Sequence, residues 1–462
     1  MGILFKQNLK KLRQIDKKVL SLKETIVCLK AIKIFLSALL LVAAAISSSR
    51  QKDTLQGKVH IEEKNGKYIL YRDGKPFYIK GASGNAHFDV LKRAGGNTVR
   101  VWDTLNLAKV LDSAAANEIA VVVGLPVFNS DYMAFYNNGS KVAKQYEAFE
   151  SVVSRFKKHP ALLMWCIGNE LDFPHKPAYL NFYKAFNELT EMIHREDPDH
   201  PVTTTVMNFN SKNIFNINAR CNVDLISFNI FSRLSFLRDE LKGVSLFWNG
   251  PFMLAEWGIN GPWEGTEQTA WGAYIEDNST KKADIYLERY KTYMPVENPR
   301  FLGAFAFYWG NKQEGTHTWF SMFDENGAES EVVSTMQYIW TGKRKEYPFP
   351  QIKYMLLDKK GARDNIILSP GNHSSAEVLM LEKAIIKTVK WQIFKEDWYK
   401  KNNLHSTRKL KPIAGLMEDD QGLNVNFKAP TDEGPYRIFA TIYDENGHFS
   451  TVNTPFYVIT DK

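Results

Sequence analysis

The sequence has few cysteines and no clustered metal ligands. Only three cysteines occur in 462 residues, one in the basic leader and one inside an apolar run. A disulfide framework and the paired-cysteine motifs of zinc and redox proteins are therefore excluded. The ten histidines show no metal-ligand spacing, and neither Gly-x-Gly-x-x-Gly nor a phosphate loop follows the first predicted strand. We expect no metal site and no cofactor.

Net positive charge is scarce outside the N-terminal segment, although the formal net charge of the whole chain is +8. Residues 1–33 hold eight Lys and one Arg against Asp16 and Glu24, which is +7 and leaves +8 − 7 = +1 for the rest of the chain. A polyanion-binding face is not indicated. We therefore expect no nucleic-acid partner.

A plain membrane span is also missing, because it needs about 20 apolar residues. The apolar stretch Ile34–Ile46 is only thirteen residues long, follows the basic leader and precedes small residues. This order is typical of an export signal with a cleavage site near Ala45 or the serines that follow. We expect residues 1–50 to be a leader with a signal peptide and the protein to be periplasmic, cell-surface or extracellular. Membrane anchoring by an uncleaved signal stays open.

Short buried runs and longer helical segments alternate through the middle of the chain. Two hairpin dipeptides, Asn65-Gly66 and Asp73-Gly74, precede them. Eight strands, each followed by a helix-length segment, are typical of a (β/α)8 TIM barrel in the α/β class, here over residues 51–345 with the N-terminal hairpins. The predicted strands lie at 77–81, 98–102, 119–127, 162–170, 202–208, 224–230, 252–258 and 303–310.

The C-terminal part has a different pattern. Pro348 and Pro350 indicate a linker, and short alternating strands separated by turn residues follow it. This pattern predicts an all-β sandwich of the immunoglobulin or fibronectin type over residues 346–462. The predicted strands of the sandwich lie at 376–382, 388–396, 422–430, 436–447 and 454–460.

Two glutamates end predicted strands of the barrel. Asn169-Glu170 closes the fourth strand and Glu256 closes the seventh. Catalytic residues of such barrels lie at the C-terminal ends of the strands. Two carboxylates on opposite walls of one mouth are what glycoside hydrolysis with retention requires, one as nucleophile and one as acid and base. A helix-start glutamate or a rim ion pair is the alternative reading of each.

The chain from Phe77 to Trp340 resembles glycoside hydrolase clan A, whose members have a (β/α)8 barrel and a retaining mechanism. The resemblance is closest to family 2 barrels and to fungal-type β-1,3-glucanosyltransferases, in the segments PFYIKGASGN, LKRAGGNTVRVW, RFKKHPALLMWCIGNEL and PFMLAEWG. It implies that Glu170 is the acid and base and Glu256 the nucleophile. Asn169 would bind the sugar 2-hydroxyl.

The resemblance also implies supporting residues. Arg100 would lie beside the nucleophile and keep it ionised, and Trp309 would form the floor of the sugar subsite. One departure is visible, because clan members commonly have a Tyr after the sixth strand, where SFNIFSRL offers only Asn229 and Phe231. Either a Tyr from elsewhere or a different arrangement must hold the nucleophile.

For other residues the sequence leaves two roles open. Asn229 is a ligand or a turn residue, and Trp102 lines the pocket or lies beside a helix cap. Trp263 and Trp271, in the long loop after the seventh strand, stack on sugar or pack the loop. Three loop glutamates are expected to be solvated, namely Glu264, Glu267 and Glu276.

The sequence predicts an exported glycoside hydrolase or transglycosidase that acts on β-linked oligo- or polysaccharides by double displacement. Trp residues near the mouth favour sugar transfer, but no residue decides between water and a sugar as acceptor. The alternative is a non-catalytic carbohydrate-binding or cell-surface scaffold protein that retains the barrel.

Overall fold

The computed structural model describes residues 57–344, 349–397 and 408–460. The expected leader and signal segment, residues 1–50, lies outside them, as does the expected domain boundary at 345 and 346. Across the described ranges, no helix is both long and apolar enough to span a bilayer. Gly57–Lys462 forms one compact unit.

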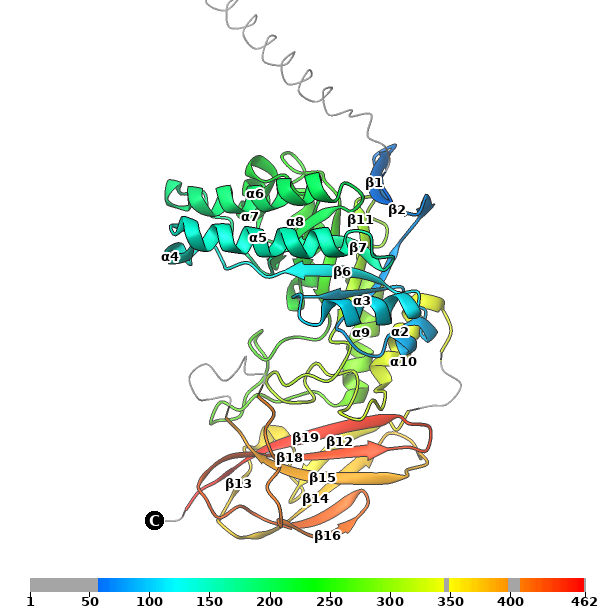
Figure 1. Cartoon of the computed structure of the whole chain (residues 1–462). Helices are drawn as coiled ribbons and strands as arrows, with labels where there is room; N and C mark the ends of the chain where they lie inside the picture. Colours follow the sequence, from blue (N-terminus) through cyan, green and yellow to red (C-terminus); the bar gives the residue numbers. More distant parts are fainter. Residues whose placement is uncertain (1–56, 345–348, 398–407, 461–462) are drawn as a thin grey trace, which may run out of the picture. The chain divides into compact units, whose positions relative to one another are not determined.

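Eight parallel strands close into a barrel in the order β10-β11-β4-β5-β6-β7-β8-β9, of which Figure 1 labels β6, β7 and β11. Each overlaps one of the eight predicted runs, so the expected barrel is confirmed. The strands are β4 (Ile79–Ser83), β5 (Thr98–Val101), β6 (Ala120–Leu125), β7 (Leu162–Ile167), β8 (Val202–Met207), β9 (Leu225–Asn229), β10 (Phe252–Trp257) and β11 (Phe301–Phe307).

Helices lie between the strands and bury one face each. In α6, Phe182, Phe186, Leu189 and Ile193 recur at helical spacing and are all buried. The helices are α2 (Phe88–Arg93), α3 (Leu107–Ala116), α4 (Met133–Tyr136), α5 (Gly139–Phe156), α6 (Leu180–Glu196), α7 (Ser211–Arg220), α8 (Leu237–Gly243), α9 (Ser279–Tyr293) and α10 (Glu331–Thr341), with short 3-10 turns η1 (Pro177–Tyr179), η2 (Ser232–Phe236) and η3 (Ala362–Asp364).

A small antiparallel sheet covers the N-terminal end of the barrel. It consists of β1 (Val59–Lys64), β2 (Lys67–Arg72) and β3 (Lys75–Pro76). Val59 and Leu70 of this sheet join the same buried cluster as the barrel interior. The backbone N–H of Val59 bonds the Asp199 carbonyl and that of Tyr68 bonds the Pro299 carbonyl, both just before barrel strands. The opposite, C-terminal end is therefore the one available for a site.

Two four-stranded sheets form the C-terminal sandwich, in the orders β12-β14-β17-β16 and β13-β19-β18-β15. Residues from both sheets share one hydrophobic core, which confirms the expected β-sandwich. Three strands, β12, β13 and β16, were not among the predicted ones. The strands are β12 (Ile352–Leu357), β13 (Ile367–Leu368), β14 (His373–Met380), β15 (Thr388–Lys395), β16 (Met417–Gln421), β17 (Asn424–Lys428), β18 (Gly434–Tyr443) and β19 (Phe449–Val458).

Candidate active site

The chain turns sharply where β7 ends. Gly168 has φ 74° and Glu170 has φ 55°, both in the left-handed region that residues other than Gly, Asn and Asp adopt rarely. A Cβ atom at Gly168 would lie 2.4 Å from Cδ1 of Leu171. Only glycine therefore allows the backbone to turn at this point. An unfavourable backbone conformation at Glu170 is typical of residues held in position for function.

Glu256 is buried at the end of β10, where 6 % of the residue is exposed. Its Oε1 accepts two hydrogen bonds from β5 and the residue after it: Arg100 Nη1 lies at 2.6 Å and Trp102 Nε1 at 2.7 Å. Across the described ranges, no donor bonds Oε2 of Glu256. One oxygen of this carboxylate is fixed by a cation and an indole, and the other is left for chemistry.

A chain of hydrogen bonds joins the two carboxylates. Arg100, which also bonds Glu256, donates from Nη2 to Asn169 Oδ1 at 2.6 Å. Asn229 Nδ2 donates to the same Asn169 oxygen at 3.2 Å and to Glu170 Oε1 at 2.9 Å. Together with Trp102, which also bonds Glu256, six of the residues predicted from sequence lie in one connected cluster at the C-terminal ends of the strands.

The two carboxylates have different surroundings. Burial raises the pKa of Glu170, and the nearby charges of Glu256 and Glu314 raise it further, whereas the Asn229 amide and the Arg100 cation act in the opposite direction. Glu256 instead forms a direct ion pair with Arg100. Two carboxyl groups whose environments differ in this way are suited to separate roles, one as proton donor and one as anion.

Aromatic rings and an ion pair lie beside Glu256. The Trp102 ring stacks on Tyr308 with centroids 5.9 Å apart and meets Phe307 edge-on at 6.0 Å. Lys312 Nζ lies 4.8 Å from the Phe307 centroid and 2.6 Å from a carboxylate oxygen of Glu314. Tyr308, Lys312 and Glu314 were missed in the sequence. Their position just after the eighth strand was the available signal.

The prediction that Trp309 forms the floor of a sugar subsite is wrong. Trp309 is fully buried, and its indole N–H bonds the carbonyl of His87. Its ring packs against Phe323 and Trp340. The Tyr308 ring contacts Trp102 at the mouth, whereas the Trp309 ring contacts Trp340 of α10 in the helical layer.

Trp263 and Trp271, from the long loop after β10, lie in different surroundings. Trp263 is 40 % exposed and its ring lies 6.0 Å from Phe320, which in turn contacts Phe307 of the mouth. Its proposed contact with sugar stays a prediction. The Trp271 ring instead packs against Tyr457 in β19. For Trp271 the structure therefore favours packing over sugar stacking.

One of the three loop glutamates is not solvated as expected. Glu267 is exposed and paired with Arg363, and Glu264 is half-buried and accepts the backbone N–H of Gly261. Glu276, however, is 6 % exposed and forms an ion pair with Lys282. The expectation of a solvated Glu276 is wrong because donors from three separated segments surround its carboxylate.

Within the part of the chain that the structure describes, no other tyrosine replaces the one that is missing after the sixth strand. Among the described residues, the hydrogen-bond donors to Glu256 are Arg100 and Trp102. Phe231 occupies the region after β9 and packs against Phe307 and Phe320. The nucleophile candidate is thus held by an indole N–H where a phenol was expected.

Within the ranges that the structure describes, no group of three or more His, Cys, Asp or Glu side chains is arranged to hold a metal ion. The side chains gathered at the mouth supply carboxylates, a guanidinium, an ammonium group, amides and aromatic rings.

Residues 97–262, which include Arg100, Glu170 and Glu256, match the family described as glycosyl hydrolases family 2, TIM barrel domain. The matched stretch runs from β5 to β10 of the barrel. This confirms the expected resemblance to clan A.

Curated relatives match a shorter stretch of the chain. The β-glucuronidases of Pongo abelii and Homo sapiens are each 28 % identical over an alignment of 149 residues, and the alignment covers 28 % of this chain. The matched part spans only 22 % of the length of these relatives.

Solved structures are similar at low identity. A β-glucuronidase of Bifidobacterium dentium complexed with coumarin-3-O-glucuronide has 17 % identity and a TM-score of 0.48, covering 63 % of this chain and 50 % of its own. An endo-β-1,4-mannanase of Thermotoga petrophila has 12 % identity and a TM-score of 0.43, and the match covers 84 % of this chain and 99 % of the mannanase chain.

Proposed function

We propose that this chain is a retaining β-glycosidase, with Glu256 as nucleophile and Glu170 as acid and base. The observation that carries the proposal is the contrast between the two carboxylates of one barrel mouth. Arg100 and Trp102 bind one oxygen of Glu256, whereas burial and the charge of Glu256 raise the pKa of Glu170. A carboxylate paired with a cation and a carboxyl that retains its proton are the pair that double displacement needs.

In the first step Oε2 of Glu256 attacks the anomeric carbon, and the bond from that carbon to the leaving oxygen breaks. Glu170 gives its proton to the leaving oxygen, which leaves Glu170 as a carboxylate. In the second step Glu170 takes a proton from water or a sugar hydroxyl, and the oxygen of this acceptor displaces Glu256 from the sugar. The sugar keeps its β configuration because the centre is inverted twice.

The neighbouring polar groups fit roles in binding. Oδ1 of Asn169 is engaged by Arg100 and Asn229, so its amide nitrogen is directed to other acceptors, and we assign it to the sugar 2-hydroxyl. Trp102 carries both a donor for Glu256 and an aromatic face for the sugar. Trp263 extends the aromatic surface beyond the mouth.

The family 2 match and the β-glucuronidase relatives support a β-glycoside as substrate. Aryl β-glucuronides are the first substrates to test because the curated relatives carry that name. A β-galactoside, a β-mannoside, and β-1,3- and β-1,4-linked glucans complete the panel. Transfer to a second sugar instead of water is compatible with the aromatic mouth and is distinguished by the products.

The test incubates the purified protein with this panel and follows products by mass spectrometry and the first-formed anomer by proton NMR. We expect turnover with retention, lost in Glu256→Ala and kept in Glu267→Ala, an exposed loop glutamate that serves as control. Products longer than the substrate identify a transglycosidase. Inversion contradicts the mechanism. Tight sugar binding without turnover supports the scaffold alternative.

Export of the chain is a further part of the proposal. It rests on the basic leader and the apolar stretch Ile34–Ile46. Mass spectrometry of the native N-terminus tests it, because a cleaved signal removes this stretch and an anchor retains it.

A further inference from the structure

The loop that follows β11, residues 311–321, reaches the mouth of the site. Its Lys312 Nζ lies 4.8 Å from the ring centroid of Phe307 and 5.9 Å from that of Trp102, whose indole bonds the proposed nucleophile. Glu314 pairs with Lys312, and its charge acts on Glu170. One charged pair of this loop therefore touches the surroundings of both catalytic candidates.

Hydrogen bonds within the loop fix its shape. The backbone N–H of Lys312 donates to Ser321 Oγ at 2.9 Å, and Ser321 Oγ also bonds the carbonyl of His317 at 2.8 Å. The backbone N–H of Glu314 donates to the carbonyl of Thr316 at 3.0 Å. Whatever holds Thr316 therefore also holds Glu314.

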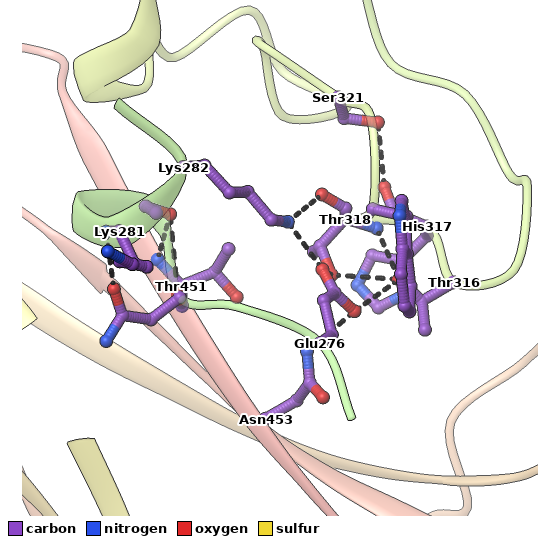
Figure 2. Close-up of polar contacts among 12 residues, drawn as sticks. Glu276, Lys281, Lys282, Thr316, His317, Thr318, Ser321, Thr451 and Asn453 are labelled. Carbon is purple, nitrogen blue, oxygen red and sulfur yellow. Dashed lines mark hydrogen bonds and ion pairs between the residues drawn. The ribbon is translucent and has the colours of Figure 1, made fainter. Parts of the chain in front are cut away.

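The group that holds Thr316 is Glu276, from the segment before α9 (Figure 2). Thr316 Oγ1 donates to one oxygen of Glu276 at 2.6 Å, and Thr318 Oγ1 donates to the other at 2.8 Å. Lys282 Nζ lies 2.6 Å from Glu276 and donates to the carbonyl of Thr318 at 2.7 Å. All four residues are buried. The loop is thus attached to a carboxylate away from the mouth.

Glu276 is a charged anchor. Burial acts to raise the pKa of Glu276, but the Lys282 cation, its hydrogen bond, the Thr316 hydroxyl and the Arg437 cation outweigh burial, and the pKa is lowered. A buried carboxylate is tolerated only while its donors stay in place. Each donor is therefore strongly held, and the removal of one affects the others.

The sandwich supplies one of these donors. Asn453 of β19 donates from Nδ2 to Glu276 at 2.8 Å and accepts from Arg437 Nη1 of β18 at 2.7 Å. Arg437 Nη2 bonds the carbonyl of Tyr274, close to Glu276 in sequence, at 2.6 Å. Because both ends of the Asn453 amide are engaged, β18 and β19 hold the anchor from the side of the sandwich.

We propose that Glu276 and Asn453 are positioning residues for the loop 311–321, and that the C-terminal sandwich thereby takes part in shaping the active site. This inference rests on the proposed function for its catalytic consequence. Its structural part, the attachment of the loop to the sandwich, is independent of the substrate.

The first test is hydrogen–deuterium exchange of the full chain without substrate. Asn453→Ala removes a donor to a buried carboxylate, and we expect exchange in residues 311–321 to become about tenfold faster or more. Asn426→Ala changes an exposed asparagine of β17 in the other sheet and is expected to leave this loop unchanged. Equal exchange in the wild type and Asn453→Ala overturns the proposal, as does an equal increase in both variants.

The second test is the pH profile of kcat/KM on an unactivated β-glycoside. The charge of Glu314 raises the pKa of Glu170, so Glu314→Gln is expected to move the alkaline limb to lower pH. Asn453→Ala is expected to move the alkaline limb in the same direction, because the loop that carries Glu314 shifts. Asn426→Ala is expected to leave the alkaline limb in place. If residues 311–321 exchange faster in Asn453→Ala but the alkaline limb of its kcat/KM profile stays at the wild-type position, the catalytic part of the proposal is overturned.

The two proposals fail separately. If the wild type turns over no β-glycoside, the proposed function fails, and the exchange experiment still decides whether Asn453 holds the loop. If the wild type is active and Asn453→Ala matches it in exchange, in the alkaline limb and in KM, the positioning role fails alone. A purely stabilising role of Asn453 would lower the unfolding temperature without moving the limb.

Discussion

The guanidinium of Arg100 lies 2.6 Å from Oε1 of Glu256, and both side chains are buried. Breaking a buried ion pair by removing one partner costs about 3 to 5 kcal/mol, since the other charge is left uncompensated. Arg100 also bonds Asn169. A single cation on β5 thus aligns the ends of β7 and β10, and its loss affects stability and the site together.

Trp102 and Trp309 are expected to respond oppositely to the same substitution. Trp102→Phe removes the indole N–H bond to Glu256 while keeping an aromatic ring, so we expect kcat/KM to fall by about tenfold or more, from the loss of a hydrogen bond to a charged group. Trp309→Phe changes a fully buried ring away from the mouth. It is expected to lower the unfolding temperature with little effect on KM.

Steady-state kinetics and thermal unfolding of both variants check this prediction. A raised KM in Trp309→Phe at unchanged stability would restore the sequence-based assignment of Trp309 to the sugar subsite. Unchanged kinetics in Trp102→Phe would remove the indole from the support of Glu256.

Glu170→Gln is expected to separate substrates by their leaving group. Aryl glycosides with good leaving groups need little proton donation, whereas alkyl glycosides and oligosaccharides need it fully. A general acid contributes about 10²- to 10⁴-fold, so we expect a loss of that size on poor leaving groups and a much smaller loss for the first step on activated ones. Burst kinetics separate the two steps. Equal losses in the first step on both substrate types would contradict the acid role.

The same variant is expected to change how stability depends on pH. A free glutamate titrates at a pKa of about 4.3, and burial and Glu256 raise the pKa of Glu170 in the folded protein. The folded state therefore binds more protons between these two values, so wild-type stability falls as pH rises through this window. Glu170→Gln stays neutral and escapes this loss.

Thermal unfolding from about pH 4 to pH 8, either side of the ordinary pKa, measures the difference. We expect the unfolding temperature of Glu170→Gln to match the wild type at the acid end and to exceed it at the neutral end. Glu267→Gln, at an exposed glutamate, is the control. If the difference in unfolding temperature between Glu170→Gln and the wild type is the same at every pH tested, Glu170 does not titrate as proposed.

The sequence predicted the elements that a strong repeating pattern defines. The eight apolar runs are buried on both faces. Few folds other than a barrel can bury eight such strands that alternate with helices. Glu170 and Glu256 followed from the rule that strand ends form the site. Strand β13, with only Ile367–Leu368, is too short for any periodicity to appear.

Side-chain direction in the loops could not be predicted in the same way. Trp309 and Tyr308 are adjacent aromatic residues after one strand. The direction in which each ring points depends on where the strand ends relative to the neighbouring strands. Glu276 appeared to be a solvated loop charge because its partners, Thr316 and Asn453, are 40 and 177 residues away in sequence. Contacts of this range leave no local pattern.

Gly168 provides a test of the turn that presents Asn169 and Glu170. Its φ of 74° costs a residue with a side chain about 1 to 2 kcal/mol, and a Cβ would also lie 2.4 Å from the Leu171 side chain. We expect Gly168→Ala to lower stability by at least that amount and kcat on unactivated substrates by more than tenfold. The catalytic loss is expected because a small displacement of the proton donor spoils its alignment.

Gly139→Ala is the matched control for this turn. Gly139 begins α5, does not have a positive φ, and a Cβ there meets nothing within 4 Å. Alanine at such a site is neutral or stabilising, since it reduces the freedom of the unfolded chain. Unfolding temperature and kcat are measured for both variants. If Gly168→Ala retains full kcat while Gly139→Ala also does, the conformation of this turn is not what positions Glu170, and the proton donor must be aligned by the Asn229 hydrogen bond instead.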